Sequence, residues 1–244
     1  MAVMASTSYV DLHIHTCHSD GWPTPAAVVD HVRWAGGLDA IAITDHDTIE
    51  GALLARDYAA ALDNAPLVIV GEEVSTLDGH VLGLFLTEHV SPGLPASDTV
   101  DAIHAQGGVA IAAHPFWRPE RPDRNGHRIH GVGWKATDTP FDAIEVENAT
   151  PGFYLFNQMA HRMQEECGVA GVGCSDAHIL EAIGRAQTGF PGSGEAALRG
   201  ALAGGTTTAH RVRYQPRGLA MYMAWGLHHH AMKRASRQSR RAEA

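Results

Sequence analysis

The sequence predicts an α/β fold in which mostly parallel strands alternate with helices and close into a barrel. Short, uninterrupted apolar runs alternate along the chain with longer segments of helical spacing. Strands that are apolar throughout are typical of a sheet covered by helices on both faces. Six or more such units favour a barrel over a small open sheet. With 244 residues and 45% hydrophobic content, the chain is large enough to bury one sizeable core.

The first half of the chain contains the clearest helix signal. The segment 24–37 (TPAAVVDHVRWAGG) places Thr24 as N-cap, Pro25 at the first helical position and two glycines as the stop. Two further helices are expected over residues 48–63 and 96–108. Expected strands cover residues 8–15, 38–44, 66–74, 80–86 and 109–113.

The second half continues the alternation and ends in a basic segment. Strands are expected at 141–147 and 169–174, and helices at 152–168 and 193–205. We expect residues 1–216 to form the barrel domain, and residues 217–244 a C-terminal helix with a basic, disordered tail. The run His228 to His230 is interpreted as a solvated helix end, with binding of stray nickel or zinc as the alternative.

The charge of the chain is unevenly distributed. Net charge is −9, but the last twelve residues hold five basic residues and one acid, so the remaining body is near −13. Such a body repels nucleic acid unless bound divalent cations offset the charge, and we expect no stable binding of duplex nucleic acid. Histidine is unusually frequent, at 17 residues, which indicates metal ligation or scattered surface histidines.

The composition predicts a soluble cytoplasmic protein that does not contact membranes. The longest apolar runs, such as PLVIV and GVAIAA, are too short to span a bilayer, and the N-terminus lacks the pattern of a secretion signal. Three cysteines are too few, and odd in number, for a disulfide framework. A reducing compartment agrees with this count.

Imidazoles and carboxylates recur where the expected strands end, and barrels of this type place their active sites just after the C-terminal ends of strands; His80 instead stands at the start of a strand. His13 and His15 stand two apart at the end of the first strand, so both imidazoles lie on one face. The other candidates are Asp20, His46, Glu72 or Glu73, His80, His114, Asp176 and His178. Nine mixed nitrogen and oxygen ligands exceed the needs of one ion and suit two or three ions that share a bridging carboxylate.

The motifs D-x-H-x-H…SDG, TDHD, G-x-E, H-x-LG, AHP and SDAH, in this order, resemble those of the PHP family, named for bacterial polymerases and histidinol phosphatases. The resemblance extends from about Tyr9 to Phe190 and implies a distorted seven-stranded β/α barrel with a trinuclear metal site. Carried over by position, it implies nine ligands: His13, His15, Asp20, His46, Glu73, His80, His114, Asp176 and His178. Glu73 is preferred to Glu72 because the third residue of G-x-E ligates in the family.

Two features depart from the family pattern. Several members carry a long insertion between H-x-LG and AHP, but here His80 and His114 are only 34 positions apart. We therefore expect a barrel without a large cap insertion and an open site. Cys174 stands in GCSDAH, where the family often has glycine. It is interpreted as a small buried residue that ends a strand, with a ligand or redox role as the alternative.

The resemblance implies a metal-dependent phosphoesterase that uses two or three Mn, Fe or Zn ions. The nucleophile would be a metal-bridging hydroxide held through the ligands, so no separate protein nucleophile is expected. Asp11 and Asp45 are candidates for steadying ligand imidazoles, with loop or capping carboxylates as the alternative. Candidates for binding phosphate are Arg118, Arg185 and Lys135, each of which could instead be ordinary surface charge.

The expected substrate is a nucleotide or a short oligonucleotide, because Phe116 and Trp117 could stack on a base. Packing of these rings against the barrel rim is the alternative. A histidinol-phosphatase-like or other small-phosphomonoester phosphatase is the rival enzyme. A non-catalytic PHP interaction module is disfavoured because it has no need of nine ligand-type side chains. A C–N hydrolase also uses H-x-H, but SDG, TDHD and SDAH fit PHP better.

Overall fold

The computed structural model describes residues 6–117 and 131–242, with side chains as far as residue 232. Its strands form one nine-stranded sheet of order β7-β6-β5-β4-β3-β2-β1-β8-β9. The strands are β1 (Thr7–Ile14), β2 (Ala40–Ile43), β3 (Leu67–Ser75), β4 (His80–Leu84), β5 (Val109–Ala112), β6 (Ala143–Asn148), β7 (Ala170–Cys174), β8 (Ala186–Pro191) and β9 (Thr208–Arg211). The helices are α1 (Pro25–Ala35), α2 (Glu50–Ala60), α3 (Ala96–Ala105), α4 (Tyr154–Cys167), α5 (Gly194–Ala203) and α6 (Pro216–Ala242), with short 3-10 turns η1 (Gly133–Asp138) and η2 (Leu180–Ala182).

The sheet curls into a nearly closed barrel. Strands β1 to β3 pair in parallel, as do β5 to β7, while β4 and β8 run opposite to their neighbours. A bridge between Ile14 and Ala177 joins the end of β1 to the segment after β7, and the Gly173 amide donates to Thr188 Oγ1 of β8. This arrangement confirms the distorted β/α barrel. Between β4 and β5 the chain forms only α3 and its connections, so this region holds no large cap.

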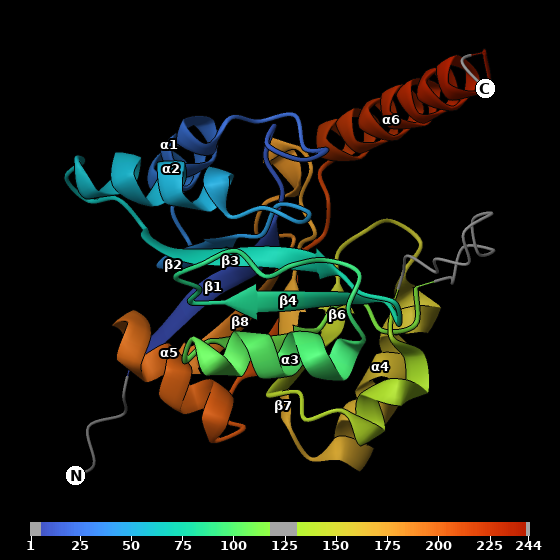
Figure 1. The fold of residues 1–244 in the computed structure, drawn as a ribbon. Helices are drawn as coiled ribbons and strands as arrows, with labels where there is room; N and C mark the ends of the chain where they lie inside the picture. The colour runs from blue at the N-terminus through green and yellow to red at the C-terminus, as the bar shows by residue number, and fades with distance from the viewer. Residues whose placement is uncertain (1–5, 118–130, 243–244) are drawn as a thin grey trace, which may run out of the picture.

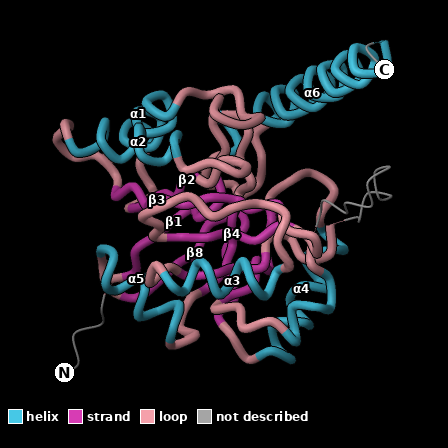
Figure 2. The backbone as a smooth tube through the Cα atoms, viewed as in Figure 1, coloured by secondary structure: helices cyan, strands magenta, loops and turns pink. Residues whose placement is uncertain are grey.

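Helices surround the strands, which gather at the centre of the molecule (Figure 2). Figure 1 shows α1 and α2 on one side of the sheet, α3, α4 and α5 on the other, and α6 projecting from the body. The predicted N-cap of α1 is confirmed, because Thr24 Oγ1 accepts from the Ala27 amide at 3.2 Å. That helix buries Val28, Val29 and Val32 in the larger of two apolar clusters.

Two regions differ from the sequence expectation. Strands β8 and β9 lie where no element was predicted, and β8 pairs with β1 through four residue pairs. Helix α6 continues to Ala242, through the segment expected to be a disordered tail. The boundary between barrel and C-terminal segment remains a prediction. No helix in the described part of the chain combines the length and the apolar character needed to cross a membrane.

Candidate metal centre

All nine residues singled out as metal ligands lie together at one end of the barrel. They form four overlapping groups, and within each group one ligand atom per residue lies within 4.8 Å of the others. The groups are His15/Asp20/His46/His178, His13/Glu73/His114, His13/His15/Asp176 and His46/Glu73/His80. Because the groups share members, the nine residues make one continuous cluster of donor atoms. We call them the nine-residue cluster.

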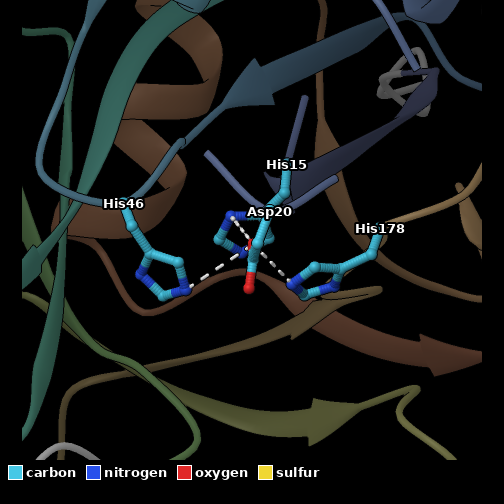
Figure 3. Close-up of side chains that lie close together, drawn as sticks. All are labelled: His15, Asp20, His46 and His178. Carbon is cyan, nitrogen blue, oxygen red and sulfur yellow. Dashed lines mark ion pairs between the residues drawn. The ribbon is translucent and has the colours of Figure 1, made fainter. Parts of the chain in front are cut away.

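The first group, here called the open group, is drawn in Figure 3, where Asp20 lies between the imidazoles of His15, His46 and His178. Asp20 Oδ1 is 3.1 Å from His178 Nε2, 3.8 Å from His15 Nδ1 and 3.9 Å from His46 Nε2. Within this group the side chains of Asp20 and His46 are 23% and 27% exposed, whereas Glu73, His80 and His114 of the other groups are at most 7% exposed. The open group is therefore the part of the cluster that a ligand reaches first.

Glu73 lies at the centre of the buried part of the cluster. Its Oε2 is 3.2 Å from ring nitrogens of His13, His15 and His46. Its Oε1 is 2.7 Å from His80 Nδ1 and 2.9 Å from His114 Nε2. One carboxylate thus faces five imidazoles, so Glu73 would be a ligand if this cluster held metal ions.

The spacing of donor atoms fits the coordination shells of divalent ions. His13 Nε2 and His15 Nε2 are 3.0 Å apart, and Asp176 Oδ1 lies 3.5 Å and 3.3 Å from them. Atoms that bind one ion at about 2.1 Å lie about 3.0–3.5 Å from one another. Within the described residues, the buried atom His114 Nδ1 makes no hydrogen bond, and Asp20 Oδ1 and His46 Nδ1 have only the ion-pair contacts given above. Buried polar atoms need such partners, and bound cations would supply them.

Glu72 and Glu73 point in opposite directions, as neighbouring residues of a strand do. Glu72 Oε1 is 2.7 Å from His89 Nδ1, and Glu72 Oε2 accepts from the Val90 amide at 3.0 Å. Glu72 is therefore outside the nine-residue cluster, which agrees with the preference for Glu73 as the candidate ligand.

Without cations, protons on the histidines balance the carboxylates. Burial alone would lower the pKa of His15, but hydrogen bonds to Asp176 and Glu73 outweigh it and raise that pKa to about 10. Burial lowers the pKa of His46 to about 3 despite the nearby Glu73. Although burial opposes it, the surrounding histidines hold the pKa of Glu73 and of Asp176 well below its usual range. Protons and metal ions therefore compete for this cluster.

The backbone is unusual at two members of the cluster. His114 and Asp176 have φ angles of 24° and 52°, in a region that residues with a side chain seldom adopt. The His114 amide donates to Glu145 Oε2, and Asn148 Nδ2 donates to Asp176 Oδ2 at 3.2 Å. Buried partners thus stabilise both strained positions, a pattern typical of functional sites.

Glu145 supports the cluster in a way that the sequence did not reveal. Its Oε1 lies 3.4 Å from His13 Nδ1 and accepts from Asn148 Nδ2 at 3.2 Å. Glu145 is buried near the end of β6, the strand that follows β5 and its His114. The available signal was a carboxylate in a strand, AIEVEN, that alternates apolar and polar residues from its second to its fifth position.

Asp11 and Asp45 accept hydrogen bonds from backbone amides, and Asp45 also accepts from a hydroxyl group. Asp11 accepts from the amides of Ser175 and Gly184, at 3.0 Å and 2.8 Å, and burial raises its pKa to about 6. Asp45 accepts from the amide and hydroxyl of Thr16 at 2.7 Å and 2.6 Å. In the described contacts neither carboxylate bonds an imidazole. Both instead organise loops that carry members of the cluster.

Of the predicted phosphate-binding residues, Arg118 lies outside the described residues. Arg185 donates to the carbonyl oxygens of Glu181 and Arg213. Lys135 is exposed and pairs with Asp78. Neither side chain has a contact with the nine-residue cluster among those described, so their phosphate-binding role remains a prediction.

The aromatic residues and the cysteine near the cluster pack into the protein. Trp117 stacks on Phe153 with ring centroids 4.0 Å apart, and Phe116 meets Trp134 at 5.2 Å. These contacts agree with packing at the barrel rim and weaken the expectation that the rings stack on a base. Cys174 is fully buried in an apolar cluster, where burial raises the pKa of its thiol.

Comparison with known proteins adds family evidence to this geometry. A family model described as PHP-associated matches residues 155–207. An uncharacterized protein of Methanocaldococcus jannaschii is 32% identical over 165 residues, which are 62% of this chain and 87% of that protein. A two-domain protein from Bacteroides vulgatus that contains a predicted PHP-like metal-dependent phosphoesterase shares the fold, with a TM-score of 0.69 and 23% identity over 85% of this chain and 66% of that one.

Two further relatives have named activities. The phosphoribosyl 1,2-cyclic phosphate 1,2-diphosphodiesterase of Eggerthella lenta is 35% identical over 127 residues, 49% of this chain and 44% of the enzyme. The 5'-3' exoribonuclease Rnm of Escherichia coli is 39% identical over 88 residues, 33% of this chain and 30% of the enzyme. The chain thus matches less than half the length of either enzyme.

Proposed function

The chain belongs to the PHP family of metal-dependent phosphoesterases, and we propose that its substrate is a nucleotide or a short oligonucleotide. The main support for metal-dependent catalysis is the arrangement of the nine-residue cluster around Glu73, which faces five imidazoles. We assign these nine residues as ligands of two or three divalent ions, of Mn, Fe or Zn. When bound, such ions activate water and stabilise charge on phosphoryl oxygens.

The protein side chains have three tasks in this proposal. The cluster holds the ions, and the buried partners Glu145 and Asn148 keep His13 and Asp176 in position. The exposed edges of Asp20 and His46 form the side from which the phosphate group enters. No protein nucleophile is required, because the attacking oxygen would come from water.

The substrate class rests on relatives and is the finer part of the proposal. Similarity to the exoribonuclease supports an oligonucleotide substrate. Similarity to the diphosphodiesterase supports a small phosphate ester as the second candidate. The acidic body disfavours stable binding of duplex nucleic acid. A cytoplasmic location also remains a prediction.

A hydrolysis panel tests the proposal. The metal-loaded protein is offered an aryl phosphate, nucleoside mono- and bisphosphates, short oligonucleotides, a cyclic ribose phosphate and histidinol phosphate, each with and without a chelator. We expect chelator-sensitive hydrolysis, detected as free phosphate from monoesters and as released nucleotides or ring-opened product from diesters, that is fastest on a nucleotide or an oligonucleotide. Faster hydrolysis of histidinol phosphate or of the cyclic phosphate would show that the proposed substrate class is wrong. No turnover with any ion would favour the non-catalytic module.

A further inference from the structure

Helix α6 reaches the metal centre from the far end of the chain. Tyr222, Trp225 and His229 are spaced three and four positions apart, which places them on one face of the helix. This face contacts two loops that carry members of the nine-residue cluster. The contacts are independent of the family motifs, which end before α6 begins.

Trp225 makes the most direct of these contacts. Its indole Nε1 donates to the backbone oxygen of Asp20 at 2.9 Å, across 205 positions of sequence. Its ring lies against the imidazole of His178, with centroids 4.2 Å apart. Asp20 and His178 both belong to the open group. A single side chain thus contacts both the loop after β1 and the loop after β7, which are also joined by the Trp22 amide donating to the His178 oxygen at 2.9 Å.

Two neighbours on α6 extend the contact. His229 stacks on Trp225 with ring centroids 5.2 Å apart, and its Nδ1 is 3.8 Å from Asp20 Oδ2. Tyr222 Oη lies 3.3 Å from Thr150 Oγ1, which donates to Asp176 Oδ2 at 3.2 Å. Helix α6 therefore lies next to both aspartates of the cluster.

We propose that α6 forms one side of the metal centre and that Trp225 is a positioning residue that fixes Asp20 and His178 for the ion of the open group. The proposal rests on the metal binding assigned above. Asp20 stands on a loop and is partly exposed. Without Trp225 this loop would be freer before the ion binds, so binding would cost more conformational entropy and the affinity would fall. Groups that orient ligands from outside the coordination shell commonly change metal affinity by about 10- to 100-fold.

The same helix supplies a matched control. Met223 and Leu227 lie on another face of α6, where they are 63% and 73% exposed. Leu227→Ala therefore shortens an apolar side chain two positions from Trp225 without touching the described cluster. Trp225→Phe keeps an aromatic ring but removes the N–H donor, and Trp225→Ala removes both.

The experiment measures metal affinity in the 244-residue chain by chelator competition, together with the visible absorption spectrum of the Co(II)-loaded form. In Trp225→Ala we expect the most weakly held ion to lose about 10- to 100-fold in affinity and the cobalt bands to shift. Trp225→Phe should show a smaller loss, and Leu227→Ala should match wild type in both readouts.

The proposal would be overturned if both Trp225 variants had the same metal affinity and the same cobalt spectrum as Leu227→Ala. If Trp225→Ala does not fold, Trp225→Phe decides, because it loses the bond to Asp20 while keeping ring packing. A wild type that binds metal without hydrolysing any ester would refute the proposed function alone. A wild type that binds no ion would overturn both.

Discussion

His13 shows how a single side chain is prepared for a cation. Its Nδ1 faces Glu145, while its Nε2 faces Glu73, Asp176 and His15. A proton on Nδ1, donated to Glu145, leaves the Nε2 lone pair directed into the cluster. His178 follows the same logic, because its Nδ1 lies 2.9 Å from a backbone oxygen and its Nε2 faces Asp20.

Replacing Glu145 tests this orientation. Glu145→Gln keeps the shape but removes the charge next to His13, so we expect metal affinity to fall about 10- to 100-fold in a chelator-competition titration. Glu147→Gln is the control, because Glu147 instead contacts Asn157 and His161. Equal losses in the two variants would mean that Glu145 has no special role.

Metal binding should strengthen as pH rises. The pKa of His15 is raised to about 10 without metal, so its imidazole is protonated at neutral pH and an incoming ion must displace that proton. Raising the pH from about 6 to about 8 leaves His15 mostly protonated but lowers the proton concentration that competes with the ion, so apparent affinity should increase. Calorimetry in two buffers of different ionisation enthalpy measures the released protons. Affinity that is independent of pH over this range would contradict the assignment.

The nine residues that the sequence singled out lie close together, because imidazoles and carboxylates that follow neighbouring strands can be recognised by their type and position. Glu145 and Trp225 could not be found in this way. Their roles depend on distances across the barrel, such as the 2.9 Å bond between Trp225 and Asp20, which no local pattern encodes.

At the scale of elements, the loop between β1 and α1 is held close to the strand it leaves. A Cβ added to Gly21 would lie 2.5 Å from the backbone oxygen of His15 and 2.9 Å from the Thr16 nitrogen. Only glycine fits such an approach. The glycine of SDG therefore has a structural purpose, since it lets the loop fold back and bring Asp20 beside His15.

Gly21→Ala should displace this loop and weaken metal binding by the open group. The contacts are to backbone atoms, which cannot move aside as a flexible side chain would. Gly200→Ala in α5 is the control, because its added Cβ meets nothing within 4 Å and should stabilise the helix by up to about 1 kcal/mol. Thermal unfolding and metal titration of both variants check this. Wild-type metal affinity in Gly21→Ala would refute it.

Elements were predictable where local signals were strong. Helix α1 follows from Thr24, Pro25 and its buried valines. Strands β8 and β9, by contrast, have mixed sequences, AQTGFP and TAHR, without a continuous apolar run. Strand β8 pairs with β1 and with β9, and both pairings are antiparallel and join residues far apart in sequence. These two strands therefore form because of tertiary contacts and not because of a local sequence signal.

At the scale of the whole molecule, the short spacing between His80 and His114 predicted an uncovered site. No cap interrupts the barrel there, but α6 approaches the cluster from the other end of the chain. The cluster also places Glu73, Asp20 and Asp176 together in a body that is already acidic. Bound divalent ions would offset this charge.

The most direct test of the metal centre is elemental analysis of wild type, Glu73→Gln and Glu72→Gln, purified and loaded in parallel. Glu73 faces five imidazoles, whereas its neighbour Glu72 pairs with His89 outside the cluster. We predict two or three ions per chain in wild type and in Glu72→Gln, and loss of most of them in Glu73→Gln. Wild-type metal content in Glu73→Gln would contradict the assignment of this cluster as the metal centre.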